Sequence, residues 1–270
     1  MSGIFTGTGV GPGDPELITL KALRAIEKSS VLALPVSDRA MREPAYYCRA
    51  KSPDSAGQAS EERETSRYLD GCTAYQTARR ACRAAEEKDV LFLPMPMIKD
   101  KEQLKAIHDR DVRAVARLLD EGRDVAFLTI GDPSVYSTCM YVHKRLKRMG
   151  YNTALIPGVT SFCAAAARLD CSLAENREEL HILPASYEIE ESLRLPGTKV
   201  LMKAGKKLGE VKRLLTEKGL DAKMVENCGM EEERVYYSQE EIPEQAGYYS
   251  LLVVKEKSKK AQREKRRERL

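Results

Sequence analysis

The chain has 270 residues, which suggests two domains of ordinary size but does not exclude one large α/β domain. Hydrophobic residues make up 42% and charged residues 32%, so apolar side chains suffice for a core beneath a heavily charged surface. No stretch approaches the roughly 18 uncharged apolar residues of a membrane helix, and the N-terminus lacks the features of a signal peptide. We therefore expect a soluble, cytoplasmic protein with no membrane partner.

The formal net charge of +4 is concentrated at the C-terminus. Residues 255–270 hold nine Lys or Arg against three Glu, which leaves a net charge of −2 on the other 254 residues. A terminal run of like charge is typical of a solvated, poorly ordered end, although it can also bind RNA or an acidic partner. The nearly neutral body argues against nucleic acid as a partner.

The cysteines and histidines indicate no metal site. The seven cysteines form no C-x-x-C pair and have no His at metal-ligand spacing, so neither a zinc site nor a disulfide framework is expected. Cys163 and Cys171 stand in apolar sequence and are expected to fill the core. His108 and His143 lie within helical patterns, where surface positions are commoner. We assign no catalytic base.

The first part of the chain follows a strand, turn and helix order. Residues 3–10 are β-prone and lead through a glycine-proline turn into ELITLKALRAIEKS, which has helical spacing. VLALP at 31–35 is a continuous apolar run typical of a buried strand. Residues 37–71 are polar and rich in turn formers, so we expect an excursion outside the core.

The next segments repeat this order. A helix is predicted at 72–88, a strand at 90–96 and a long helix at 101–121. Residues 124–149 and 153–169 each combine a buried strand, a glycine turn and a helix. Strands that alternate with helices predict right-handed βαβ units and a mostly parallel sheet.

Beyond residue 176 the pattern changes. Short strand candidates follow one another with fewer helices between them: HILPA, TKVLMKAG, DAKMVENCG, ERVYYS and GYYSLLVV. We predict an α/β protein with an N-terminal α/β domain at 1–176, a second α/β domain at 177–254 and a basic, disordered tail at 255–270.

Ligands of open parallel sheets bind beyond the carboxyl ends of the strands, so we consider first the loops after the first, fourth and fifth predicted strands. The loop GTGVGPGDPE is dense in glycine, which lets backbone approach a ligand or another backbone closely. It contains neither G-x-G-x-x-G nor the P-loop signature. Asp38, the nearest acid to the end of the second strand, lies beyond Pro35, which disfavours a nicotinamide-dependent dehydrogenase.

The other two loops add a carboxylate and hydroxyls. Asp132 stands before Pro133 at a predicted helix start, as Asp14 stands before Pro15, so helix capping is one interpretation of both acids. The third loop, PGVTS at 157–161, opens an alanine-rich helix that can pack closely against the sheet or a flat ligand. Together the loops supply backbone amides, hydroxyls and one carboxylate at one edge of a sheet.

Four linked motifs, GVGPGDPELITLKAL, FLTIGDPSVYST, IPGVTSFCAAAARL and VLMKAG, resemble in order and spacing the tetrapyrrole methylase family over residues 3–254. Within it, the long segment between the second and third strands and DVAFLTIGDPSVYSTCMYVHKRL are most similar to the C20-methyltransferases of precorrin-2 or cobalt-factor II. The resemblance implies two α/β domains with the active site in the cleft between them, a homodimer, a tetrapyrrole substrate and S-adenosylmethionine as cofactor. Methylation of another ring position stays open.

The resemblance also implies cofactor contacts, carried over motif by motif. They are Pro12 in the first loop, Ile130, Gly131, Asp132 and Val135 in the second, Thr160 and Ser161 in the third, and Met202, Cys228 and Gly229 in the second domain. A carboxylate-rich flat substrate also requires cations and apolar or aromatic surface. The candidates are Arg67, Lys99, Arg168, Lys203, Tyr136, Tyr236 and Tyr237. Each can also be a solvated surface residue, which is the preferred interpretation for most of them.

Overall fold

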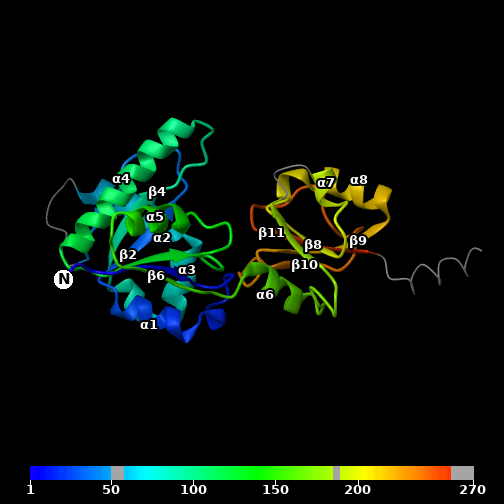
Figure 1. Cartoon of the computed structure of the whole chain (residues 1–270), viewed down its shortest axis with the longest axis horizontal. Helices are drawn as coiled ribbons and strands as arrows, with labels where there is room; N and C mark the ends of the chain where they lie inside the picture. The colour runs from blue at the N-terminus through cyan, green and yellow to red at the C-terminus, as the bar shows by residue number, and fades with distance from the viewer. Residues whose placement is uncertain (50–57, 185–188, 257–270) are drawn as a thin grey trace, which may run out of the picture. The chain divides into compact units, whose positions relative to one another are not determined.

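The computed structural model describes residues 1–49, 58–184 and 189–256. The chain divides into two compact units, Met1–Thr160 and Ser161–Leu270, and each unit contains its own β-sheet (Figure 1). Among the described residues, no helix has the length and apolar composition needed to cross a membrane.

The first unit is built on a six-stranded sheet with the strand order β3-β4-β2-β5-β1-β6. Its strands are β1 (Phe5–Gly9), β2 (Val31–Val36), β3 (Ala45–Tyr47), β4 (Asp89–Pro94), β5 (Val125–Thr129) and β6 (Thr153–Ile156). Every pairing is parallel except that of β3 with β4. The mostly parallel sheet expected from the alternation of strands and helices is confirmed.

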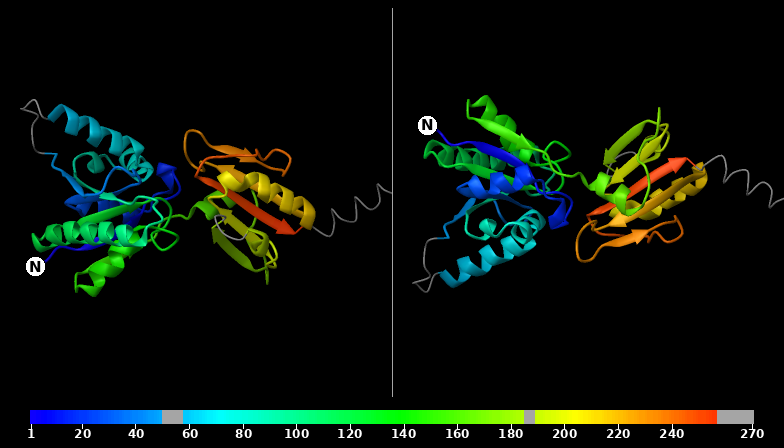
Figure 2. Two further views of the ribbon diagram at one scale, coloured as in Figure 1. Left: turned by 90° about the horizontal axis from the view of Figure 1, so that it is seen from above. Right: turned by 90° about the horizontal axis from the view of Figure 1, so that it is seen from below.

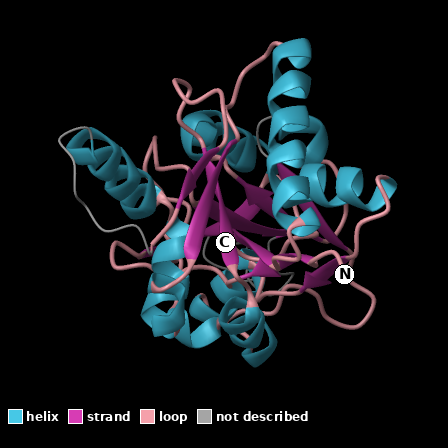
Figure 3. Ribbon diagram, turned by 90° about the vertical axis from the view of Figure 1, so that its left-hand side faces the viewer, coloured by secondary structure: helices cyan, strands magenta, loops and turns pink. Residues whose placement is uncertain are grey.

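Helices cover both faces of this sheet (Figure 3). They are α1 (Leu20–Lys28), α2 (Gln58–Gly71), α3 (Thr73–Ala81), α4 (Lys101–Asp120) and α5 (Cys139–Arg148), with the 3₁₀ turns η1 (Pro15–Leu17) and η2 (Arg83–Glu86). α1, α2 and α3 share one core with the sheet, while α4 and α5 share the other. α4 illustrates the cause, because Val112, Val115 and Leu119 recur at helical spacing and are buried.

Two helices start later than expected. Asp14 does cap a helical turn, since its carboxylate accepts the Glu16 amide at 2.9 Å, but that turn is η1. α1 begins at Leu20 with its own cap, Thr19. In the second loop the helix begins at Cys139 and not at Pro133, so Asp132 does not cap α5.

The expectation that residues 37–71 lie outside the core holds for most of the part that the structure describes, but it is wrong for a few side chains. The segment forms β3 at the edge of the sheet and α2, and Tyr68 and Leu69 of α2 are buried. The polar composition of α2 hid this, because these buried apolar side chains belong to its last turns. Residues 50–57 of the segment lie outside the described residues.

The second unit contains a five-stranded sheet with the order β10-β9-β11-β8-β7. Its elements are α6 (Ser161–Arg168), β7 (Leu180–Pro184), α7 (Ile189–Ser192), β8 (Thr198–Met202), η3 (Gly205–Lys207), α8 (Leu208–Lys218), β9 (Leu220–Glu226), β10 (Arg234–Tyr236) and β11 (Ser250–Glu256). β7 and β8 are parallel and the other pairs antiparallel. α8 packs its apolar stripe on this sheet (Figure 2). All five predicted strands are present.

The boundary between the units differs from the expected one. The sequence predicts a boundary after residue 176, whereas the chain divides after Thr160. The cause is α6, which lies against β9 and β11 of the second sheet. Lys255 and Glu256, placed in the predicted tail, complete β11, and residues 257–270 lie outside the described residues.

Candidate functional site

The three glycine loops of the first unit meet at one edge of its sheet. They follow β1, β5 and β6, which are neighbours in the order β5-β1-β6. The Gly131 amide donates to the Gly11 carbonyl at 2.7 Å, and the Gly11 amide donates back at 3.4 Å. The Val10 amide donates to the Thr129 carbonyl at 2.9 Å. The first and second loops are therefore joined by backbone hydrogen bonds.

Glycine is required where the loops contact one another. A Cβ on Gly158 would lie 2.0 Å from the Gly131 carbonyl oxygen, and one on Gly9 would lie 2.5 Å from the same oxygen. Gly11 and Gly131 have φ angles of +78° and +70°, which residues with a side chain rarely adopt. These contacts give the glycines a role in packing loop on loop, in addition to any role in admitting a ligand.

Asp132 joins the second loop to the third. One carboxylate oxygen accepts the Ser134 amide at 2.8 Å and also the Ser134 hydroxyl. The other oxygen accepts the Gly158 amide at 3.0 Å. Both oxygens are therefore engaged in holding backbone, which suits a residue that fixes loop geometry.

Among the expected contact residues of the first unit, Pro12 and Gly131 are buried, whereas Ile130, Asp132, Val135 and Thr160 are partly exposed. The Thr160 hydroxyl oxygen is buried and has no hydrogen-bond partner among the described residues. Buried polar atoms are normally paired, so this hydroxyl has hydrogen-bonding capacity left for a ligand. The loops fit a polar ligand that is held by backbone and hydroxyl groups.

Three of the four expected contact residues of the second unit lie at one edge of its own sheet. Ser161 opens α6, Met202 ends β8, and Cys228 and Gly229 follow β9. β11 lies between β8 and β9, so the two strand ends are about 10 Å apart at the usual strand spacing. The structure thus places these residues in two groups, one in each unit.

Backbone strain marks the same places. Five described residues other than glycine have positive φ, and three of them are Tyr136 at 48°, Lys203 at 61° and Asn227 at 53°. Each lies next to an expected contact residue or in the same loop. Such conformations persist only where the surroundings enforce them, and they cluster at functional sites. These conformations therefore occur beside the expected contact residues of each unit.

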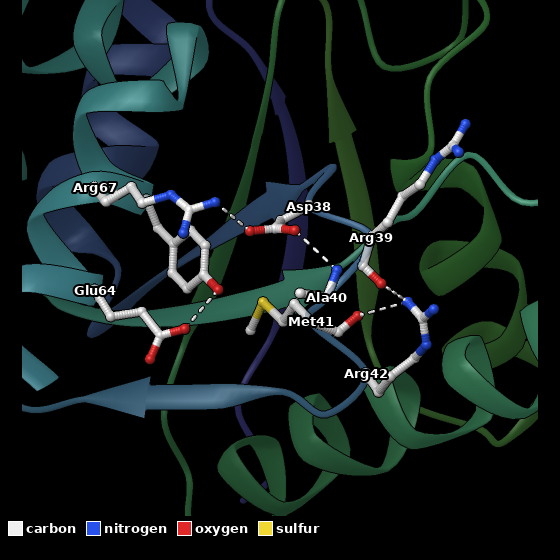
Figure 4. A network of polar contacts seen from close by, with 8 residues as sticks. Asp38, Arg39, Ala40, Met41, Arg42, Glu64 and Arg67 are labelled. Atoms are coloured by element: carbon white, nitrogen blue, oxygen red, sulfur yellow. Dashed lines mark hydrogen bonds and ion pairs between the residues drawn. The ribbon is translucent and has the colours of Figure 1, made fainter. Parts of the chain in front are cut away.

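The substrate candidates differ in what they contact. Arg67 pairs with Asp38 at 2.6 Å, and Asp38 also accepts the Ala40 amide at 2.8 Å (Figure 4). Arg168 pairs with Glu233, whose other oxygen accepts the Gly229 amide. Sequence reasoning missed Glu233, because nothing distinguishes it from Glu231 and Glu232.

Further candidates are exposed, and one of them, Lys203, directly follows β8. The Lys203 ammonium lies 5.1 Å from the centre of the Tyr248 ring, and Lys203 is exposed. Tyr136 and Tyr237 are also exposed, with half of each side chain accessible. Lys203 is thus a cation beside an aromatic ring, a combination suited to a flat anionic molecule.

Two expectations about single side chains are wrong. His108 is buried, and its ring stacks on that of Tyr141 with the ring centres 4.8 Å apart. Burial and the nearby charge of Arg145 lower the pKa of His108. Cys163 is exposed, because α6 turns Phe162, Ala165 and Ala166 inward instead. Within residues 1–49, 58–184 and 189–256, no group of three or more His, Cys, Asp or Glu is arranged to hold a metal ion.

Comparison with curated proteins finds relatives that span nearly the whole chain. The protein of Methanocaldococcus jannaschii named probable cobalt-precorrin-2 C(20)-methyltransferase is 33% identical over 255 residues, which cover 92% of this chain and 94% of that protein. The precorrin-2 C(20)-methyltransferase of Sinorhizobium sp is 29% identical, with 94% of this chain and 97% of that protein covered.

Solved structures and a family profile agree with these relatives. The uroporphyrin-III C-methyltransferase of Thermus thermophilus, solved with S-adenosylhomocysteine, shares the fold with a TM-score of 0.59 at 20% identity, over 94% of this chain and 97% of that one. The profile of the Tetrapyrrole (Corrin/Porphyrin) Methylases matches residues 5–243. The chain therefore belongs to the tetrapyrrole methylase family.

Proposed function

We propose that this chain is an S-adenosylmethionine-dependent methyltransferase that acts on carbon 20 of precorrin-2 or of its cobalt-containing form, in cobalamin biosynthesis. The observation that carries the proposal is similarity along almost the full length to two proteins named for C(20) methylation. The joined glycine loops and the unpaired Thr160 hydroxyl support it from the structure.

We propose two sets of cofactor contacts, one in each unit. In the first unit these are Pro12, Ile130, Gly131, Asp132, Val135 and Thr160, and in the second they are Ser161, Met202, Cys228 and Gly229. The polar loop edge and the free Thr160 hydroxyl fit the polar parts of such a molecule. The S-adenosylhomocysteine bound to the Thermus thermophilus enzyme also supports this cofactor.

S-adenosylmethionine supplies a methyl group that its sulfonium already activates. The task left to the chain is to bind both reactants, align them and exclude water. Asp132 orients the second and third loops, because its two oxygens accept backbone amides and the carboxylate is committed to them. Lys203 offers a cation to the substrate's carboxylates. No side chain is assigned as a general base.

The family resemblance also supports two proposals about oligomeric state and location in the cell. We propose that the chain works as a homodimer, which light scattering at several protein concentrations tests by the molecular mass in solution. We also propose that it works in the cytoplasm, which cell fractionation tests. A monomeric mass or recovery outside the cytoplasm would remove the corresponding proposal without touching the methyltransferase activity.

The substrate is tested by incubating the purified chain and S-adenosylmethionine with precorrin-2 and cobalt-factor II side by side. Mass spectrometry should show one substrate gaining CH2, because one methyl group replaces one hydrogen. The preferred substrate then identifies the metal-free or the cobalt-containing version of the pathway. Absence of methyl transfer to either would overturn the proposed function.

A further inference from the structure

Glu233 makes contacts that go beyond those of a surface acid. One carboxylate oxygen accepts the Gly229 amide at 2.9 Å, and the other accepts the Arg168 guanidinium on α6. The Cys228 side chain is also hydrogen-bonded to Glu233. We infer that Glu233 is a positioning residue that holds the Cys228–Gly229 turn in the shape required for cofactor binding. This inference rests on the proposed function.

The turn after β9 pairs the Gly229 amide with a side-chain acceptor and, among the described residues, not with backbone. Asn227 and Gly229 have φ angles of 53° and 76°, so the chain reverses through left-handed backbone after β9. The Met230 amide donates to the Asn227 carbonyl at 2.9 Å, which closes the turn itself. Gly229 donates instead to the Glu233 carboxylate, which satisfies an amide that has no ladder partner. Loss of the Glu233 carboxylate would therefore leave the Gly229 amide without its hydrogen bond, and Gly229 is an expected cofactor contact.

The charge of Glu233 is stabilised where it stands. Burial raises the pKa of Glu233, but the hydrogen bonds from Arg168 and Gly229 outweigh burial and lower the pKa below its usual value. The side chain of Glu233 is 19% exposed, whereas that of Arg168 is 54% exposed. The Glu233 carboxylate is thus ionised at neutral pH and largely buried against the turn.

α6 provides the fixed point of the arrangement. Phe162, Ala165 and Ala166 of α6 are buried, and the helix contacts β9 and β11. Arg168 projects from the last turn of this anchored helix to Glu233. The pair therefore links an anchored helix to the turn that follows β9, a different arrangement from a pair between two side chains of one exposed helix.

Such an exposed pair exists in the same unit and serves as a control. Arg213 and Glu217 on α8 form an ion pair at 2.6 Å, four residues apart, and both side chains are more than half exposed. Pairs of this kind contribute little to stability. Glu217→Gln therefore removes a comparable charge and leaves the turn untouched.

The experiment measures S-adenosylmethionine binding by calorimetry and steady-state kinetics for the wild type, Glu233→Gln, Glu233→Ala and Glu217→Gln, all in the full chain. We expect Glu233→Ala to weaken binding and raise the KM for S-adenosylmethionine about tenfold, equivalent to 1.4 kcal/mol. Glu233→Gln, which keeps one acceptor oxygen, should fall between it and the wild type. The kcat at saturating cofactor should stay within about twofold, and Glu217→Gln should match the wild type.

A second readout uses the protein without cofactor. Hydrogen exchange of the peptide that contains Gly229 should be faster in Glu233→Ala than in the wild type, because its amide has lost its acceptor. A residue that only stabilises the fold would lower the melting temperature and the active fraction, and would leave the KM of the folded enzyme unchanged. That pattern, or equal affinities throughout, would overturn the inference.

The outcomes separate this inference from the proposed function. A wild-type chain that fails to bind S-adenosylmethionine would refute the proposed function and the inference with it. A wild type that binds, beside a Glu233→Ala variant that binds equally well, would refute the inference alone. If Glu233→Ala does not fold, the isosteric Glu233→Gln variant carries the comparison.

Discussion

Replacing Asp132 tests whether its carboxylate organises the loops or takes part in proton transfer. Asp132→Ala removes the acceptor of the Ser134 amide at 2.8 Å and of the Gly158 amide at 3.0 Å. Asp132→Asn keeps one side-chain oxygen, so it retains one of the two amide contacts and loses the other. The two variants therefore remove the link between the loops in two steps.

The expected magnitude follows from these contacts. A hydrogen bond to a charged group contributes about 1.5–3 kcal/mol. Asp132 is only partly buried, so we expect the decrease in the free energy of unfolding to lie near the lower end of this range, about 1.5 kcal/mol, for Asp132→Ala. Asp132→Asn should cause a smaller decrease. Cofactor affinity should follow the same order, with the wild type above Asn and Asn above Ala.

Urea denaturation and calorimetry with S-adenosylmethionine measure the two effects. Asp100→Ala is a matched control, since Asp100 accepts two local amides at 3.0 Å as the cap of α4. It should cost about 1 kcal/mol of stability and leave cofactor affinity unchanged.

Single-turnover methyl transfer at saturating cofactor completes the test. We expect both Asp132 variants to recover to within about tenfold of the wild type, or 1.4 kcal/mol of barrier. If Asp132→Asn and Asp132→Ala were both slower than the wild type by several orders of magnitude at full cofactor occupancy, Asp132 would be a general base. The loop-organising role would then not explain its contribution to turnover. Unchanged stability and affinity in Asp132→Ala would refute the loop-organising role instead.

Three further predictions concern packing, pH and the tail. Gly158→Ala should lower the free energy of unfolding by about 1–3 kcal/mol, because its Cβ would lie 2.0 Å from the Gly131 carbonyl oxygen. Gly71→Ala is the control, because a Cβ there meets no atom within 4 Å. Equal urea midpoints for the two variants would contradict the packing argument. Burial raises the pKa of Asp111 to about 8, above its unfolded value of about 3.9. The stability that protonated Asp111 contributes is therefore fully present below about pH 3.9 and is lost progressively as pH rises to about 8. Asp111→Asn should therefore raise the urea midpoint at pH 7 and flatten its pH dependence, whereas a lower midpoint would show that the ionised carboxylate stabilises the fold. Removal of residues 257–270 should leave the melting temperature and turnover nearly unchanged, because β11 ends at Glu256 and the tail lacks apolar periodicity; a large loss of either would show that the tail binds to the enzyme.

Most strands were predictable because they are short apolar runs with clear ends. Residues 31–35 form such a run, and β2 spans Val31–Val36. α2 was not predictable, since its polar sequence has few apolar positions and its position in the fold depends on Tyr68 and Leu69 meeting the core. For His108 a signal was present, because it shares helical spacing with Val112 and Val115 on the buried stripe of α4.

The candidate site was predictable only as a set of strand ends. Motif order brings the loops to one sheet edge, and Gly11 and Gly131 do pair there. Sequence cannot show that the Asp132 carboxylate reaches the Gly158 amide, because that bond joins residues 26 positions apart. The unit boundary failed for a related reason, since helical spacing in α6 does not reveal which sheet it covers.

The central claim concerns the carbon that receives the methyl group. The chain can be incubated with its preferred form of precorrin-2 and S-adenosylmethionine labelled with ¹³C in the methyl group, and the product studied by NMR. We expect one labelled methyl group, bonded to carbon 20 of the macrocycle. A label at any other ring position, or an unlabelled macrocycle, would contradict that claim.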